Sequence, residues 1–271
     1  MKKLFIYPLL LALLSPVFPT ANAVTTDEVH VPIIMYHSLA GRIGTSSIAA
    51  DDFEADLQYL RDMGYTAVTI RALVDFVDHG TPLPEKPIVL TFDDGYYNNY
   101  SAAFPLVLKY NTPIVISIIG KDSEIWSAAE KQDERHGHLS WSHTREMADT
   151  GLVEFANHTW DMHKIEHGRK GVNMRPGEDR TTYRQQLRED LETLQTQLLK
   201  HCGVQTITFT YPFGNLCPEA SIVLAEMGFR ATLSCRDGVN VLRRGDPDAL
   251  YNMRRYERTP QRSLQAILDS H

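Results

Sequence analysis

Cysteine is scarce in this chain of 271 residues, and its three cysteines, Cys202, Cys217 and Cys235, all lie in the last third. Their spacing matches no metal-binding motif, and no histidine lies between Cys202 and the C-terminal His271. Because an odd number of cysteines cannot all form intramolecular disulfides, at least one thiol is expected to be free. The cysteines are therefore expected to be structural rather than metal ligands.

Runs of basic residues are also missing. The chain has 27 lysines and arginines against 34 acidic residues, a net charge of −7. This acidic balance argues against a nucleic-acid partner. The N-terminal apolar run at residues 4–14 is too short to span a bilayer, and Pro8 interrupts it. We therefore expect no transmembrane span in the mature chain.

The N-terminal segment has the pattern of a secretory signal peptide. Lys2 and Lys3 precede the apolar run, and Ala21, Asn22 and Ala23 form an A-x-A cleavage site. Residues 1–23 are therefore expected to be removed, with a retained membrane anchor as the alternative. Loss of the two lysines changes the net charge from −7 to −9. The mature protein is expected to be exported, to the periplasm or the extracellular space.

No low-complexity linker or internal repeat divides residues 24–271, so we expect one domain. Short runs rich in β-branched residues alternate with segments of helical periodicity, which indicates a parallel sheet. The expected fold is α/β, a distorted or incomplete (β/α) barrel with about seven parallel strands. The strands are predicted at residues 31–35, 66–70, 88–92, 114–118, 152–155, 206–210 and 230–233, and the helices at residues 51–60, 71–79, 102–110, 141–150, 182–199 and 218–227.

Two polar segments, residues 121–140 and 167–180, fit neither pattern and each follows a predicted strand. We expect long loops there. Loops at the carboxyl ends of strands often shape substrate grooves, although these two could equally be surface decoration.

Two adjacent acidic residues, Asp93 and Asp94, end the buried strand at residues 88–92 and precede Gly95. Neighbouring residues on a strand point to opposite faces, so one carboxylate could bind a metal while the other accepts a proton. A tight turn is the simpler interpretation, because Asp-Gly is a strong turn signal. The sequence around the two aspartates does not decide between these interpretations.

Two histidines, His158 and His163, follow the strand predicted at residues 152–155. Their spacing of five could bring both imidazoles to one point on a turn. Two imidazoles and one carboxylate form a site for zinc or a similar divalent ion, with open positions for water. The alternative for each histidine is a hydrogen-bonded loop residue. Because both lie at the strand end of a barrel that also presents Asp93 and Asp94, the pattern favours a metal site.

Three motifs resemble those of the polysaccharide deacetylases, carbohydrate esterase family 4 with its NodB-homology domain. They are Thr-Phe-Asp-Asp-Gly at residues 91–95, the histidine motif at residues 158–163 and Tyr-Pro-Phe-Gly at residues 211–214. Pro-Ile-Ile-Met-Tyr-His at residues 32–37 further resembles the subgroup that removes N-acetyl groups from poly-β-1,6-N-acetylglucosamine. The resemblance spans about residues 31 to 256 and identifies residues 24–271 as the expected catalytic domain.

The resemblance implies a role for each motif residue. Asp94, His158 and His163 would bind the metal, with Zn²⁺ expected first and Ni²⁺, Co²⁺ or Fe²⁺ compatible with the same donors. Asp93 would be the general base. The backbone N–H of Tyr211 could donate to the oxyanion, because Pro212 has none and forces an extended conformation on the residue before it.

Two departures from the family pattern affect this assignment. Thr210 stands where the family has an arginine that orients the base. Arg254 or Arg255, on a possible last strand beyond the seven given above, could substitute, with surface charge as the preferred interpretation for either alone. The family's C-terminal Leu-x-His, the source of the general acid, is absent. His37, which ends the first predicted strand, is the expected acid, and packing at the barrel rim is its alternative.

The expected function is metal-dependent removal of N-acetyl groups from N-acetylglucosamine units of an extracellular or cell-wall polysaccharide. This acetylated polysaccharide is the expected partner. Action on O-acetyl groups, as in a xylan esterase, is an alternative because it needs nearly the same site. A glycan-binding domain that has lost efficient turnover is the second alternative, motivated by the missing arginine and histidine. The sequence leaves the polymer, the metal and the oligomeric state open.

Overall fold

The computed structural model describes residues 27–41, 45–129 and 131–270. The signal peptide predicted at residues 1–23 lies outside them. Within these described residues, no helix is both long and apolar enough to cross a bilayer.

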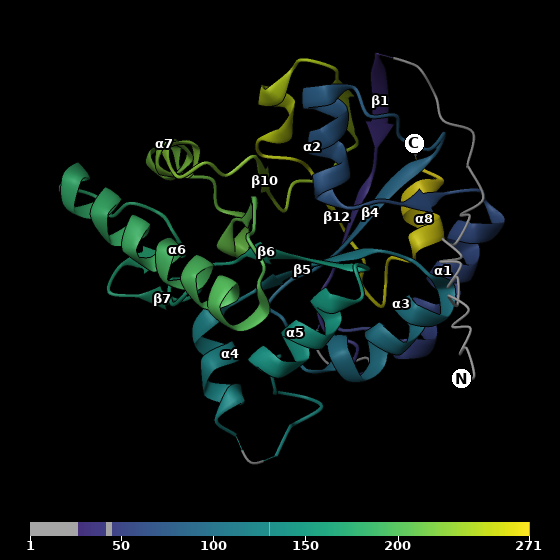
Figure 1. The fold of residues 1–271 in the computed structure, drawn as a ribbon, viewed down its shortest axis with the longest axis horizontal. Coiled ribbons are helices and arrows are strands. Elements are labelled where there is room, and N and C mark those ends of the chain that lie inside the picture. Colours follow the sequence, from purple (N-terminus) through teal and green to yellow (C-terminus); the bar gives the residue numbers. More distant parts are fainter. Residues whose placement is uncertain (1–26, 42–44, 130, 271) are drawn as a thin grey trace, which may run out of the picture.

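The centre of the molecule is a curled parallel sheet (Figure 1). Seven strands follow the order β10-β9-β6-β5-β4-β2-β12, and β3 pairs separately with β4. The predicted incomplete (β/α) barrel with about seven parallel strands is therefore confirmed. The strands are β2 (Ile33–Tyr36), β3 (Thr66–Ala67), β4 (Pro87–Phe92), β5 (Ile114–Ile118), β6 (Val153–Asn157), β9 (Thr208–Thr210), β10 (Ala231–Leu233) and β12 (Tyr256–Glu257).

The last strand nearly closes the barrel. β12 pairs in parallel with β2, and Met253, just before it, forms an isolated parallel bridge with Leu233 of β10. Residues 253–257 thus pair with β2 on one side and with β10, at the far end of the strand order, on the other. This segment was not among the predicted strands, and it delivers Arg255 to the barrel interior, where the side chain is 0% exposed.

Two strand predictions need correction. Residues 31–35 form two strands, because Pro32 has no N–H to donate and separates β1 (Glu28–Val31) from β2. β1 pairs antiparallel with β11 (Asn240–Arg243) instead of joining the main sheet. The strand predicted at residues 66–70 ends at Ala67, because the Thr69 side chain accepts a hydrogen bond from the Ala72 N–H and starts a helix at Ile70.

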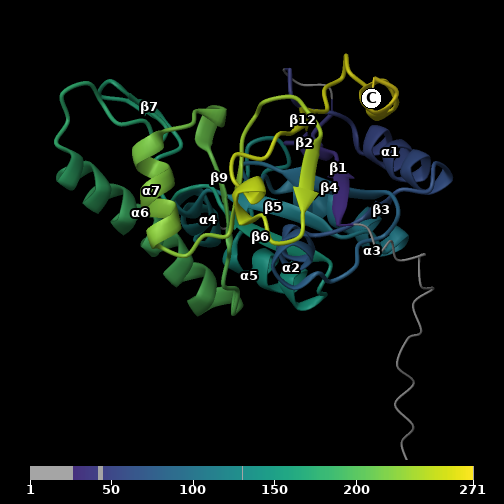
Figure 2. The same cartoon turned by 90° about the horizontal axis from the view of Figure 1, so that it is seen from above.

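The helices cover the sheet, and some of them extend the molecule to one side of it (Figures 1 and 2). Figure 2 shows α6, α7 and the β7 region to one side of the sheet, opposite α1. The predicted loop at residues 121–140 begins as α4, and the one at residues 167–180 includes β8 of a short hairpin. The elements are α1 (Ala50–Asp62), α2 (Ile70–His79), α3 (Phe104–Tyr110), α4 (Gly120–Ser127), α5 (Trp141–Asp149), α6 (Arg180–Cys202), α7 (Pro218–Glu226), α8 (Leu264–Leu268), β7 (Ile165–Glu166) and β8 (Arg169–Lys170), with a π-helix at Asn99–Ala103 and 3₁₀ turns at Pro212–Gly214 and Pro247–Leu250.

Strand alternation divides the core into two faces. On β4, Leu90 and Phe92 pack with α1, α3, α5 and α8, whereas Val89 packs with α2 and the β1–β11 pair. Further along the second face the residues become polar, with Thr91 and Asp93 on β4 and its end, both buried. The carboxyl ends of the strands therefore present buried polar groups to the barrel interior.

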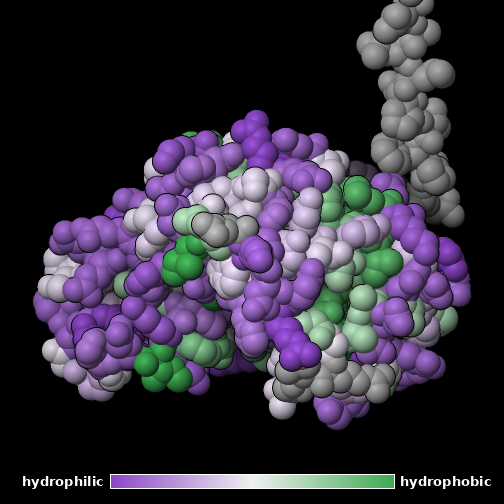
Figure 3. Space-filling model, turned by 90° about the horizontal axis from the view of Figure 1, so that it is seen from below, coloured by the Kyte–Doolittle hydropathy of each residue, from purple (hydrophilic) through white to green (hydrophobic). Residues whose placement is uncertain are grey.

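The outer surface is mostly hydrophilic. Figure 3 shows one face on which hydrophobic residues form small groups between hydrophilic ones. Scattered exposed apolar side chains are normal for a globular protein. The buried polar groups at the strand ends therefore say more about function than the outer surface does.

Candidate active site

Asp93 and Asp94 leave β4 in different conformations. The Asp93 N–H still donates to the Tyr36 carbonyl at 2.9 Å, as a strand residue would. Asp94 has a φ of 70°, which turns its side chain away from the strand direction. Gly95 follows with a φ of 69°, and a Cβ there would lie 2.9 Å from Cγ2 of Ile118. The turn therefore requires glycine after the two acids, and it gives each carboxylate its own environment.

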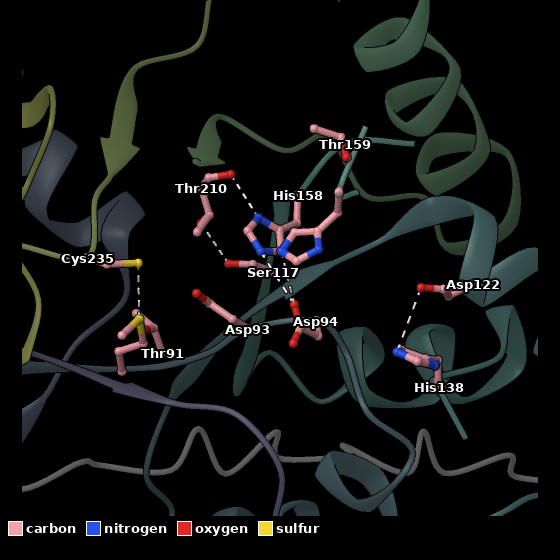
Figure 4. A network of polar contacts seen from close by, with 12 residues as sticks. Thr91, Asp93, Asp94, Ser117, Asp122, His138, His158, Thr159, Thr210 and Cys235 are labelled. Atoms are coloured by element: carbon pink, nitrogen blue, oxygen red, sulfur yellow. Dashed lines mark hydrogen bonds and ion pairs between the residues drawn. The ribbon is translucent and has the colours of Figure 1, made fainter. Parts of the chain in front are cut away.

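Asp94, His158 and His163 form a cluster with metal-binding geometry. One donor atom from each residue lies within 4.8 Å of the others. The Asp94 Oδ1 atom is 3.6 Å from Nε2 of His158 and 3.5 Å from Nε2 of His163. Figure 4 shows Asp94 pointing towards His158. The structure thus brings together the three residues predicted as ligands.

His158 is held with one nitrogen facing the cluster. Its Nδ1–H donates to the Thr210 carbonyl at 2.8 Å, so Nε2 is the nitrogen that faces Asp94 (Figure 4). The Thr210 hydroxyl in turn shares a hydrogen bond with Ser117 at 2.7 Å. Such a contact behind a histidine is typical of metal sites because it sets the tautomer and the ring orientation.

The charges of the cluster suit a divalent cation. Burial alone would raise the pKa of Asp94, but hydrogen bonding to His158 and nearby imidazoles hold it far below its usual range. Burial and the neighbouring His158 lower the pKa of His163 to about 4, so His163 is neutral at pH 7. Burial lowers the pKa of His158, yet hydrogen bonding to Asp94 and the charges of both aspartates raise it overall. The same negative charge would attract a metal ion.

The turn between the two histidines is fixed by Asn157 and by Asp190 of α6. Asn157 Oδ1 accepts from the Thr159 N–H at 2.8 Å, where Thr159 has a φ of 75°. The Asp190 carboxylate accepts from the N–H groups of Trp160 and Asp161 at 2.7 and 2.8 Å. Asp190 was not predicted from the sequence, because an acid in a polar helix resembles a solvent-facing residue.

Arg255 binds Asp93 through both carboxylate oxygens. Nη1 donates to Oδ1 and Nη2 to Oδ2, each at 2.7 Å, and Nη1 also donates to the Thr91 hydroxyl at 3.1 Å. The preference for surface charge at Arg255 was therefore wrong, and the alternative, an arginine that orients Asp93, describes the geometry. Arg254 is exposed. Burial would raise the pKa of Asp93, but the charge and hydrogen bonds of Arg255 outweigh it and hold the pKa below its usual value.

His37 lies in a cleft of about 420 Å³ that Asp94 and Tyr96 also line. Its backbone carbonyl accepts from the Asn99 side chain at 2.8 Å, which fixes the residue at the end of β2. The buried Nδ1 atom of His37 has no hydrogen-bond partner among the described residues. His37 thus lies beside Asp94 with an unused nitrogen, and its role as the general acid stays a prediction.

The prediction for the Tyr211 amide is contradicted. Its N–H donates to the Leu233 carbonyl at 3.0 Å, within the pairing between β9 and β10, and is therefore already used. The next amide in this turn belongs to Phe213, which has a φ of 58° and whose ring lies 4.5 Å from that of His163. The described residues provide no acceptor for this N–H. The Phe213 ring thus contacts one of the three predicted ligands, His163.

The cysteines are not part of the metal cluster. All three are free in the described structure, with Cys202 and Cys217 buried and Cys235 exposed. The Cys235 sulfur lies 3.7 Å from Nη2 of Arg255, and a Cβ on Gly214 would lie 2.6 Å from the Cys235 Cβ. Cys235 therefore packs between the arginine and the Phe213 turn.

Several known proteins are similar to this chain. The poly-beta-1,6-N-acetyl-D-glucosamine N-deacetylase of Escherichia coli strain K12 is 29% identical over 213 residues, which cover 71% of this chain and 31% of that protein. The protein of the same name from Staphylococcus aureus strain MRSA252 is 24% identical, over 75% of this chain and 66% of that one. The chain thus spans about a third of the length of its Escherichia coli relatives.

A solved structure and a family profile also match this chain. The solved structure of IcaB from Ammonifex degensii superposes with a TM-score of 0.73 at 28% identity, covering 88% of this chain and 95% of that one. The profile of the family described as polysaccharide deacetylase matches residues 80–232, which include Asp93, Asp94 and both histidine ligands. Because this match covers more than half of the sequence, the chain belongs to the polysaccharide deacetylase family.

Proposed function

We propose that residues 24–271 form an exported, metal-dependent enzyme that removes N-acetyl groups from N-acetylglucosamine units of an extracellular or cell-wall polysaccharide. The observation that carries this proposal is a three-residue metal cluster directly beside an ionised carboxylate, Asp93, held by Arg255. The similarity to the poly-beta-1,6-N-acetyl-D-glucosamine N-deacetylases of Escherichia coli and Staphylococcus aureus supports a poly-β-1,6-linked substrate. The A-x-A site at residues 21–23 supports export.

Asp94, His158 and His163 would hold the metal. Their two imidazole nitrogens and one carboxylate form a donor set that fits Zn²⁺, and also Ni²⁺, Co²⁺ or Fe²⁺. The hydrogen bond from His158 to Thr210 and the neutral state of His163 support this fit. When bound, such an ion lowers the pKa of a coordinated water and polarises the substrate carbonyl.

Asp93 would accept the proton of the attacking water. Its two bonds to Arg255 keep it ionised and fix its orientation, both of which a general base needs. The water oxygen then bonds to the acetamide carbon, and negative charge develops on the former carbonyl oxygen. The Phe213 N–H is the proposed backbone donor to this oxyanion, replacing the Tyr211 amide.

His37 would protonate the nitrogen as the carbon–nitrogen bond breaks. The products are then acetate and a free amine on the sugar. The position of His37 in the cleft beside Asp94 supports this role, because a general acid must lie within reach of the leaving nitrogen. Because Arg255 already holds Asp93, the absence of an arginine from the third motif is no longer an argument for a domain that only binds glycans.

The test measures acetate release by the metal-loaded protein from N-acetylglucosamine oligomers, with acetylated xylan as the comparison. We expect release from the oligomers and a loss of at least about a hundredfold in Asp93→Asn at unchanged metal content. Release from xylan alone would identify an O-acetyl esterase. Binding of the oligomers without any release would instead identify a glycan-binding domain.

A further inference from the structure

The cleft beside Asp94 is lined by an arginine. Asp94 and His37 line it, together with two segments that we call its walls, residues 45–47 and the segment containing Arg135. We call this the Arg135 cleft. Its volume of about 420 Å³ is within the range of small-ligand sites, so a sugar unit next to the reacting one can occupy it.

The two walls are tied together by Asn98, which is only 1% exposed. Asn98 Oδ1 accepts from the Leu39 N–H at 2.7 Å, and Nδ2 donates to the Ser38 hydroxyl at 3.0 Å and to the Glu134 carbonyl at 2.9 Å. The Arg135 wall is also bonded to the turn after Asp94, because the Leu139 N–H donates to the Gly95 carbonyl at 2.8 Å. The cleft is therefore preformed.

Two hydroxyl groups of the opposite wall, those of Ser46 and Ser47, are already used as donors. The Ser46 hydroxyl donates to Glu257 at 2.6 Å, and the Ser47 hydroxyl donates to the Gly41 carbonyl at 2.6 Å. The Ser38 hydroxyl accepts from the Ala40 N–H as well as from Asn98. A ligand in the cleft must therefore find most of its donors elsewhere.

Arg135 offers the cleft a charged donor. Asp133 Oδ1 accepts from its backbone N–H at 2.7 Å, but no carboxylate in the described parts of the chain is ion-paired with its guanidinium. Asp94 is the acidic residue that lines the cleft, and it belongs to the metal cluster. The nearby Glu134 and Glu257 side chains bond to Ser101 and Ser46. A bound divalent metal would offset the negative charge of Asp94. The guanidinium of Arg135 would then give the cleft a positive charge.

We propose that Arg135 makes the enzyme sense the charge of the neighbouring sugar unit, an inference that rests on the proposed function. A neighbour that is still N-acetylated is neutral and offers its carbonyl oxygen to the guanidinium. A neighbour that has already lost its acetyl group carries a protonated amine at neutral pH, which the guanidinium repels. One deacetylation thus slows the next on the adjoining unit, and free amines become spaced along the polymer.

The experiment uses two tetramers of N-acetylglucosamine, one fully acetylated and one with a single free amine at a defined unit. Acetate release is measured at pH 6.5, where the amine is protonated, and products are sequenced by mass spectrometry. We expect the wild type to react about three- to tenfold more slowly beside the amine than in the fully acetylated tetramer. In Arg135→Gln this ratio should approach one, whereas Arg135→Lys should keep it.

A matched control is Arg61→Gln, which removes the same charge from an exposed arginine paired with Asp62 on α1. It should leave the ratio unchanged. The metal-loaded Asp93→Asn protein is also tested for binding of both tetramers, so that charge sensing is measured without turnover. Absence of acetate release with selective binding would reject the proposed function alone. Equal rates and equal affinities for the two tetramers, or an unchanged preference in Arg135→Gln, would overturn the inference.

Discussion

Arg255 and Asp93 are separated by 162 residues, yet they form a buried two-bond ion pair with both distances at 2.7 Å. The arginine enters the barrel on the segment that bridges β10 and β2. It does not come from the position of Thr210, where the family pattern has an arginine. A planar guanidinium can hold both carboxylate oxygens at once, which a lysine ammonium cannot. The orientation of Asp93 is therefore set by a residue that no sequence motif marks.

Replacing Arg255 with lysine should lower kcat for acetate release by about ten- to a hundredfold, because Asp93 loses its second hydrogen bond and its fixed orientation. The pKa of Asp93 is held low by Arg255, so weakening the pair raises it and moves the acidic limb of the pH–rate profile to higher pH. Arg254→Lys, on the exposed neighbour, is the control and should change neither quantity. An unshifted acidic limb in Arg255→Lys would contradict this account.

Asp190→Asn should weaken metal binding by about ten- to a hundredfold, because an amide has one oxygen for the two N–H groups of Trp160 and Asp161. The turn that positions His163 would then be less rigid. Metal affinity is measured by competition with a chelator, and Glu189→Gln on the exposed face of the same helix is the control. Equal affinities in both variants would assign Asp190 a purely structural role.

The same residue should affect how stability depends on pH. Burial raises the pKa of Asp190 from 3.8 to about 6, so the native state favours the protonated form more than the unfolded state does. Its contribution therefore lowers stability as pH rises from about 4 to about 6. Urea unfolding of Asp190→Asn at pH 4.5 and 6.5 should show a smaller loss over this interval than the wild type. If the free energy of unfolding changed equally in the wild type and in Asp190→Asn between these two pH values, this contribution would be excluded.

Gly214→Ala should reduce both stability and acetate release. The residue has a φ of 65°, and an added Cβ would lie 2.6 Å from the Cys235 Cβ, so the Phe213 turn must shift. Gly203→Ala is a matched control, because Gly203 has a φ of 68° with nothing within 4 Å of an added Cβ. The control should lose only about 1 kcal/mol of stability and no activity. Similar rates for the two variants would show that the turn tolerates the shift.

Arg258→Met should destabilise the fold by about 3–5 kcal/mol, because Asp56 would remain buried without its charged partner. Arg258 Nε donates to Asp56 Oδ2 at 2.8 Å, and the Tyr36 hydroxyl donates to the same oxygen at 3.1 Å. Burial already raises the pKa of Asp56. The double variant Asp56→Asn with Arg258→Met should recover part of the loss in urea unfolding. A double variant that is less stable than Arg258→Met would contradict this explanation.

The sequence predicted the central strands well, because buried parallel strands are continuous apolar runs with a clear signal. The strand predicted at residues 114–118 is β5 without any shift. β12 has only two residues, and so short a strand carries no periodicity, which is why Arg255 could not be placed. The assignment of the Tyr211 amide failed for a related reason, since the pairing of β9 with β10 uses that N–H and depends on register rather than composition.

Arg255 lies near the C-terminal end of the sequence, and this affects the order in which the parts of the site can form during synthesis. Chains are synthesised from the N-terminus, and every predicted metal ligand and Asp93 precede Arg255 by more than ninety residues. A nascent or truncated chain that ends before residue 253 would hold the metal donors and the base but not the guanidinium that fixes the base. We therefore expect metal binding to mature before hydrolysis does, so that the C-terminal segment acts as the final assembly step.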